Sequence, residues 1–226
     1  EPCCIVDSLI LTKELYLITN KKEYLDLFNR IYTNSIRTFQ RDNGGAGCAT
    51  CAIHSHYEMK MFLYEAFFCC TMRLGNGLGS IADFTIVKKD NQYFIPFTCA
   101  VDYEDDDVAF LVDAEFYEGK RIQIEVKKAS NAELFIRLPE DAKVEGYPLE
   151  NGWLHLSLNK KEKMNLFVSI HVSKEKGLHF YGDMLLTRKD EILEPHFLLD
   201  NQVYSYLYDS SLFTEEELKG KIQYVK

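Results

Sequence analysis

The sequence lacks a hydrophobic run long enough to cross a membrane. Its most apolar stretch, residues 61–72, is interrupted by Glu65, whereas a membrane-spanning helix needs about 20 apolar residues. An internal repeat and a low-complexity segment are also missing. The chain begins at Glu1 with no start methionine, basic segment or small-residue cleavage site, so no signal peptide is visible. We expect a globular protein from which processing or truncation removed whatever came first.

Positive charge is also scarce. The 226 residues include 35 acidic and 26 basic side chains, which gives a formal net charge of −9. The resulting field repels phosphate backbones and anionic lipid, which excludes nucleic acid and membrane as expected partners. At 46% hydrophobic residues, the chain is long enough to bury a sizeable core in one large domain or two small ones.

Cysteine, in contrast, is abundant and unevenly placed. The seven cysteines form an odd number, and six of them fall in close pairs: Cys3 with Cys4, Cys48 with Cys51, and Cys69 with Cys70. This distribution is typical of metal or redox chemistry rather than of a secreted disulfide framework. We therefore expect mostly reduced thiols, which favour a cytoplasmic location. The sequence does not define an oligomeric state.

The first part of the chain has helical periodicity. Apolar residues recur near helical spacing over residues 4–19, and Asn20 ends the pattern. A second amphipathic helix is expected over residues 22–41. Periodicity leaves the structure of residues 57–67 open. Gly75-Asn76-Gly77 indicates a turn or a flexible helix entry, with a short helical pattern after it.

Beyond residue 89 the pattern changes to short runs of β-branched and aromatic residues, which predict strands. Two runs alternate clearly, one at Ile122, Ile124 and Val126 and one at Leu154, Leu156 and Leu158. The close spacing of the runs predicts an antiparallel β-sandwich. The expected strands are residues 93–101, 108–117, 121–126, 133–138, 153–158, 165–172 and 178–187.

Three features occur in a telling order. Glu1-x-Cys3 opens a helix, the vicinal pair Cys69-Cys70 follows, and a glycine-containing helix then leads into the strands. This order resembles glycoside hydrolase family 127, the β-L-arabinofuranosidases. Residues 132–139 and 152–156 are similar to two sandwich strands of that family, and the resemblance covers about residues 1–187.

The resemblance implies an α+β fold, in which terminal helices of an (α/α) barrel precede an antiparallel β-sandwich. Residues 1–90 would be the end of the barrel catalytic domain with its Cys-rich metal site. Residues 91–226 would form the β-sandwich domain with a C-terminal tail. The chain would then be part of a retaining glycoside hydrolase with a carbohydrate substrate, and its acid/base glutamate would lie upstream of residue 1.

The resemblance also implies a zinc site with Glu1, Cys3, Cys69 and Cys70 as ligands and Cys69 as nucleophile. Most retaining glycosidases use a carboxylate nucleophile. A thiolate can replace it if it stays deprotonated, and bound zinc deprotonates a thiol. Adjacent side chains of a β-strand point to opposite faces, so Cys69 and Cys70 cannot both reach one ion from a strand. We therefore expect irregular backbone at this pair.

Other interpretations remain open beside this one. The chain could be a non-catalytic zinc-stabilised or carbohydrate-binding module, because the acid/base residue is absent from it and Cys4 adds another thiol. Cys48-x-x-Cys51, with His54 and His56 nearby, has the spacing of a zinc knuckle, and a redox pair is a further alternative. Simple packed thiols are the favoured interpretation of this pair.

Two further features have ordinary structural interpretations. Asp105-Asp106-Asp107 lacks the alternating ligands of a calcium loop and is interpreted as a solvated turn between strands. The single tryptophan, Trp153, is interpreted as a residue of the sandwich core rather than as a sugar platform.

Overall fold

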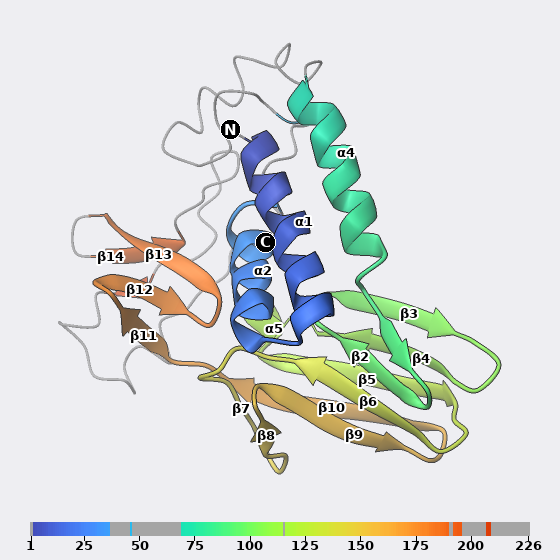
Figure 1. Cartoon of the computed structure of the whole chain (residues 1–226). Coiled ribbons are helices and arrows are strands. Elements are labelled where there is room, and N and C mark those ends of the chain that lie inside the picture. The colour runs from blue at the N-terminus through green and yellow to red at the C-terminus, as the bar shows by residue number, and fades with distance from the viewer. Residues whose placement is uncertain are drawn as a thin grey trace. The chain divides into compact units, whose positions relative to one another are not determined.

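The structure is a computed structural model, and it describes residues 2–36, 46, 69–114, 116–189, 192–195 and 207–208. The chain divides into two compact units, which are treated separately. One unit comprises the described residues of Glu1–Ile81 and His171–Lys226, and the other comprises Ala82–Ile170. Helices and antiparallel-rich sheets make the chain an α+β protein (Figure 1). No helix among the described residues is long and apolar enough to cross a membrane.

Three helices form the first part of the first unit. Helix α1 spans Pro2–Thr19, α2 spans Lys22–Asn34 and α4 spans Cys69–Ala82. Helix α1 confirms the expectation for residues 4–19 and ends where expected, because Asn20 has a φ of 53° and donates its N–H to the carbonyl of Tyr16 at 2.7 Å.

Helix α2 is shorter than the expected 22–41. It ends at Asn34, and Ser35 is non-helical, with φ −134° and ψ −63°. The Asn34 side chain is buried against the sheet of this unit, where it donates to the carbonyl of Asp183 and accepts from the N–H of Leu185, both at 2.7 Å. These bonds hold the end of α2 in place. Residues 37–41 of the expected helix lie outside the described part of the chain.

Helix α4 corrects two expectations. It begins at Cys69 and runs through Gly75-Asn76-Gly77, where we expected a turn or a flexible helix entry, and its backbone at Cys69-Cys70 is helical rather than irregular. Packing explains the glycine at position 77, since a Cβ added there would lie 2.9 Å from Cγ1 of Val6 in α1. The glycine therefore permits a close helix–helix approach instead of breaking the helix.

The first unit also contains a five-stranded antiparallel sheet in the order β11-β12-β13-β14-β15. The expected strand at residues 178–187 is split into β12 and β13 by a turn at Gly182-Asp183. The strands of this sheet are β11 (Val172–Glu175), β12 (Leu178–Tyr181), β13 (Met184–Lys189), β14 (Ile192–Pro195) and β15 (Leu207–Tyr208).

The second unit contains two five-stranded sheets. Their orders are β1-β2-β6-β9-β8 and β3-β4-β5-β10-β7. Pairing is antiparallel except for β2 with β6, which is the one parallel pair among the described strands. The strands are β1 (Val87–Lys89), β2 (Gln92–Ile95), β3 (Ala100–Glu104), β4 (Ala109–Asp113), β5 (Arg121–Lys128), β6 (Ala132–Arg137), β7 (Lys143–Val144), β8 (Leu149–Glu150), β9 (Trp153–Leu158) and β10 (Glu162–Ser169).

The inner faces of these two sheets contact each other. Tyr93 of β2 meets Tyr103 of β3 and Phe110 of β4 edge to face, with ring centroids 5.6 and 5.9 Å apart. The two alternating runs are confirmed, since Ile122, Ile124 and Val126 are at most 2% exposed and Leu154, Leu156 and Leu158 at most 4%. Alternation therefore identified the faces that build this core.

Two expected strands end early. Residues 93–101 are divided between β2 and β3 because Pro96, just after β2, has no N–H to donate to a strand ladder. Residues 108–117 form β4 followed by the short helix α5 (Phe116–Gly119). Trp153 was predicted to lie in the core, and this is wrong: it is half-buried on the face opposite to that of Leu154.

Candidate metal and nucleophile site

The sequence-predicted thiols Cys3, Cys69 and Cys70 converge in the first unit. Cys3 lies in the first turn of α1, and Cys69 and Cys70 are the first two residues of α4. The Sγ of Cys3 is 3.8 Å from the Sγ of Cys69 and 3.3 Å from the Sγ of Cys70. The first turn of a helix therefore lets two adjacent cysteines approach one partner, which a strand would not allow.

This thiol cluster, defined as Cys3, Cys69 and Cys70, fits a metal ion. Its three sulfur atoms lie within 4.8 Å of one another. A tetrahedral zinc with Zn–S bonds of about 2.3 Å separates its sulfur ligands by about 3.8 Å. The Cys3–Cys69 separation of 3.8 Å matches that value, and the Cys3–Cys70 separation of 3.3 Å is shorter. An all-sulfur set favours soft metals such as zinc over magnesium or calcium. The cluster is thus compatible with metal binding.

The three thiols differ in exposure. Cys70 is fully buried, Cys3 is half-buried and Cys69 is exposed. A ligand approaching from solvent can therefore reach the sulfur of Cys69 but not that of Cys70. The exposed thiol is the one suited to attack a substrate, and the buried thiol is suited to hold a metal.

Two contacts hold the helices that carry the cluster. Arg73 of α4 forms an ion pair with Asp7 of α1, and Gly77 packs against Val6 further along the helices. Both helices thus begin at the cluster and run in the same direction away from it (Figure 1).

The hydroxyl of Thr71, the residue after Cys70, forms two hydrogen bonds with Ala46. It donates to the carbonyl of Ala46 at 3.2 Å and accepts from the N–H of the same residue at 3.0 Å. Ala46 is fully buried. The chain on either side of Ala46 lies outside the described residues, and so do Cys48, Cys51, His54 and His56 of the suggested zinc knuckle.

Two other residues near Cys3 bear on the ligand set: Glu1, the fourth predicted ligand, and Cys4, the additional thiol. Glu1 lies outside the described residues. Cys4 is exposed and is not a member of the metal-compatible cluster found in the described part of the chain. Its carbonyl accepts a hydrogen bond from the Ser8 hydroxyl at 2.8 Å. Cys4, although adjacent to Cys3 in the sequence, is therefore not a ligand of this cluster.

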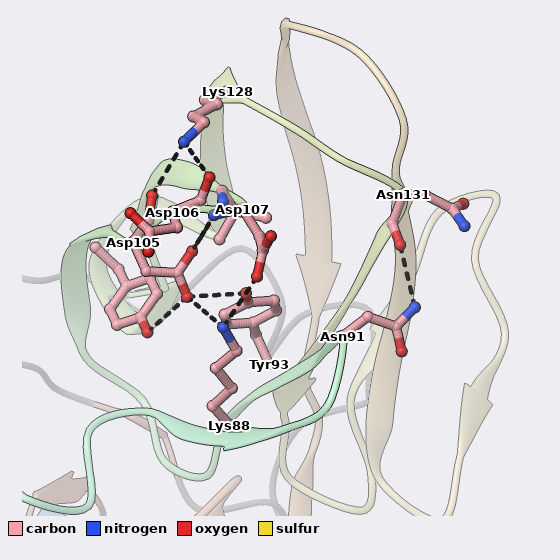
Figure 2. Close-up of polar contacts among 10 residues, drawn as sticks. Lys88, Asn91, Tyr93, Asp105, Asp106, Asp107, Lys128 and Asn131 are labelled. Carbon is pink, nitrogen blue, oxygen red and sulfur yellow. Dashed lines mark hydrogen bonds and ion pairs between the residues drawn. The ribbon is translucent and has the colours of Figure 1, made fainter.

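A second polar cluster, centred on Asp105, lies in the other unit (Figure 2). Asp105 follows β3, so the aspartate run is a turn between β3 and β4, as expected. Its Oδ2 accepts from Lys88 at 2.7 Å, from Tyr93 at 2.9 Å and from Tyr103 at 3.1 Å. Its Oδ1 accepts from the N–H groups of Asp107 and Val108 at 2.8 and 2.9 Å.

The charges of the Asp105 cluster balance each other. Burial alone raises the pKa of Asp105, but the Lys88 ammonium and the backbone N–H groups of Val108 and Asp107 outweigh it and hold that pKa well below its usual range. The hydrogen bond to Asp105 raises the pKa of Lys88. Both charges are therefore fixed, and the cluster serves to anchor the β3–β4 turn rather than to exchange protons.

The fold defines a class: an α+β chain with a glycoside-hydrolase-like fold and a cysteine cluster compatible with metal binding. No protein-family model and no curated protein matches the sequence. Among solved structures, the chain is similar to a GH127 β-L-arabinofuranosidase from Geobacillus stearothermophilus T6, with a TM-score of 0.57, 12% identity and 82% of this chain covered. It is also similar to a protein described as a glycoside hydrolase, with a TM-score of 0.60, 14% identity and 85% coverage.

These likenesses show the fold alone because the sequence identities are low. The chain spans 36% and 40% of the length of the two solved chains.

Proposed function

We propose that this chain is part of a retaining glycoside hydrolase that acts on β-L-arabinofuranosides or related sugars. The observation that carries the proposal is the thiol cluster at the start of α1 and α4, within a chain whose fold matches glycoside hydrolases. The proposal includes a helical (α/α) barrel segment over residues 1–90 and a β-sandwich domain with a tail over residues 91–226.

Zinc is the proposed metal. Cys3, Cys69 and Cys70 would hold it, with Glu1 as the fourth ligand that the family resemblance implies. When bound, zinc keeps a coordinating thiol deprotonated at neutral pH. The half-buried and buried positions of Cys3 and Cys70 suit two ligands that hold the ion without contacting the sugar.

Cys69 is the proposed nucleophile. Its Sγ would attack the anomeric carbon, forming a C–S bond as the glycosidic C–O bond breaks and the electron pair leaves on the departing oxygen. That oxygen takes a proton from a general acid, which the family resemblance places upstream of residue 1. A water molecule, whose proton passes to the conjugate base of that general acid, would then attack the same carbon opposite the sulfur. The C–S bond breaks with its electron pair returning to sulfur as the thiolate, and the two inversions give overall retention.

The test uses the full-length protein and an arabinofuranose analogue that carries a haloacetamide group. We expect the analogue to alkylate Cys69, identified by peptide mass spectrometry, and Cys69→Ser to abolish hydrolysis of an aryl β-L-arabinofuranoside. Cys4→Ser is the matched control and should retain activity, because Cys4 lies outside the thiol cluster. Undiminished turnover by the Cys69→Ser protein would overturn the mechanism.

A zinc-loaded full-length protein that hydrolyses no furanoside would instead favour the non-catalytic, zinc-stabilised module. In that case the metal would contribute stability, as structural zinc sites do.

A further inference from the structure

The outer face of the β1-β2-β6-β9-β8 sheet carries a patch of rings. Alternation along β9 turns Leu154, Leu156 and Leu158 toward the core, which leaves Trp153 and His155 on the opposite face. Phe94 of β2 and Phe135 of β6 lie in the same row as His155, because Phe94 pairs with Phe135 and Phe135 pairs with His155. These four residues, Phe94, Phe135, Trp153 and His155, are called the outer aromatic patch.

Three of the rings are stacked on one another across neighbouring strands. The centroids of Phe94 and Phe135 are 4.6 Å apart with an interplanar angle of 13°, and those of Phe135 and His155 are 4.5 Å apart with an angle of 2°. Phe94 and Phe135 are half-buried, and His155 is exposed. The far side of His155 faces a strand edge, since β8 pairs with β9 only at Trp153 and Leu154.

Trp153 is oriented differently from the stacked rings. It pairs with Arg137 on β6, so its indole must reach across β6 to meet Phe94 on β2. The two rings meet at 83°, with centroids 5.6 Å apart. Phe94 is the only ring in contact with Trp153 in the described part of the chain, so the indole is not stacked face to face on any of those rings.

Hydrogen-bonding groups border the rings. His155 donates from Nε2 to Oε2 of Glu133, and the Ser157 hydroxyl donates to the same oxygen at 2.9 Å. No described residue hydrogen-bonds to the other carboxylate oxygen of Glu133 or to the indole N–H of Trp153. The patch therefore offers an acceptor and a donor to a ligand beside its aromatic surface.

We propose that the outer aromatic patch, with Glu133 and Ser157, binds a neutral glycan at a site separate from the thiol cluster. Sugar rings present polarised C–H groups on one face, which pack against electron-rich ring faces, and hydroxyl groups at their rim, which need donors and acceptors. The indole of Trp153 and the far side of His155 supply ring faces that no other described ring covers, and Glu133 supplies an acceptor. This site goes beyond the proposed hydrolysis and does not depend on Cys69.

Size and charge favour a glycan over other occupants. The patch extends from β2 to β9, which is two strand spacings or about 10 Å. That width suits one or two sugar rings, whereas a stable protein interface needs about 800 Å² from each partner. The charges also balance locally, because the Glu133 carboxylate and the Lys89 ammonium both border the patch, with Lys89 over the Phe94 ring at 5.7 Å. An anionic ligand gains little there.

The test exploits Trp153 as the only tryptophan of the chain, so its fluorescence reports on the patch alone. The probes are three neutral polysaccharides, namely arabinan, arabinoxylan and a soluble β-glucan, with heparin as the anionic comparator. We expect at least one neutral probe to shift the Trp153 emission in a saturable way and to retard the chain in affinity gel electrophoresis.

Variants locate the binding. Glu133→Gln and His155→Ala should each weaken binding of that probe about tenfold, which corresponds to the loss of one good contact. Phe167→Ala is the control, because Phe167 is an exposed ring on β10, in the other sheet. It should bind like the parent chain. Matching melting temperatures would confirm that the variants are folded.

Several results would overturn the proposal. Binding of no neutral probe would do so, and so would binding that Glu133→Gln and His155→Ala leave unchanged. A response to heparin alone would show an anion site instead. An emission change that depends only on protein concentration, with a doubling of molecular mass in light scattering, would show that a second copy of the chain covers the patch.

Discussion

The thiol cluster and the Asp105 cluster bring charged or ionisable groups together in opposite ways. Asp105 has its counter-ion within the chain, because Lys88 lies 2.7 Å away and two tyrosines and two backbone N–H groups complete its hydrogen bonds. The thiol cluster assembles three ligands of the same kind, all sulfur, which would repel one another as thiolates. A cluster whose charge is balanced internally stabilises the fold, whereas one that needs a cation from outside is suited to bind it.

The largest expected effect is on the zinc content of the thiol cluster. Purified under reducing conditions, the chain should hold about one zinc per molecule, and Cys3→Ser combined with Cys70→Ser should remove nearly all of it, because one thiolate cannot retain the ion. Elemental analysis measures the content. Cys4→Ser should keep the parental zinc, since Cys4 is exposed and outside the cluster. Zinc retained by the double variant would place the metal elsewhere.

The next largest effect is on the stability that the Asp105 cluster contributes. Asp105→Asn removes the charge that Lys88, Tyr93 and Tyr103 share, and it should lower the free energy of unfolding by about 2–3 kcal/mol, as expected when hydrogen bonds to a charged group are lost. Urea unfolding followed by Trp153 fluorescence reports on this unit, because Trp153 belongs to it.

Asp106→Asn is the matched control for that variant. Asp106 is exposed, and no described residue hydrogen-bonds to its carboxylate or forms an ion pair with it. The free energy of unfolding of the Asp106→Asn variant should stay within about 0.5 kcal/mol of that of the parent chain. Equal losses for the two variants would show that the aspartate turn acts only through its net charge.

The stability contributed by the Asp105 cluster should also depend on pH. The pKa of Asp105 is lower in the folded chain than its usual value of about 4. Unfolding therefore raises the proton affinity of this carboxyl, so its stabilising contribution is complete above about pH 5 and is lost as the pH falls below about 4 toward the folded pKa. The stability difference between the parent and Asp105→Asn should shrink by about half or more between pH 6 and pH 3. A constant difference would contradict the assigned cause.

Sequence reasoning identified these two clusters to different extents. Alternation and turn composition placed the aspartate run between strands correctly, but its partners Lys88 and Tyr93 come from β1 and β2, and no local pattern reveals such a long-range contact. The thiols were found through their resemblance to a known family, and the structure brings three of them together. The outer position of Trp153 was missed, although its alternation with Leu154 signals it.

Glycine was the other source of error. Gly75-Asn76-Gly77 has the composition of a turn, and composition alone does not distinguish a turn from a helix that another helix approaches closely. The residue that packs against the glycine distinguishes these two cases. For Gly77 that residue is Val6 of α1, one helical turn beyond Cys3. The close approach of α1 and α4 therefore has a direct link to the geometry of the thiol cluster.

The smallest expected effect tests that link with substitutions in one helix. A methyl group at Gly77 would lie 2.9 Å from a methyl of the stiff Val6 side chain, so Gly77→Ala should push α4 from α1 and cost about 1 kcal/mol in stability despite the better helix propensity of alanine. Gly75→Ala and Gly79→Ala meet nothing within 4 Å and should instead stabilise α4 by about 0.5–1 kcal/mol. Thermal unfolding gives the signs. Competition with a chelator should show weaker zinc retention for Gly77→Ala alone, because its displaced helix widens the Cys3–Cys69 separation beyond the observed 3.8 Å, which already matches tetrahedral zinc. The same stability change for all three glycine variants would refute the packing role of Gly77.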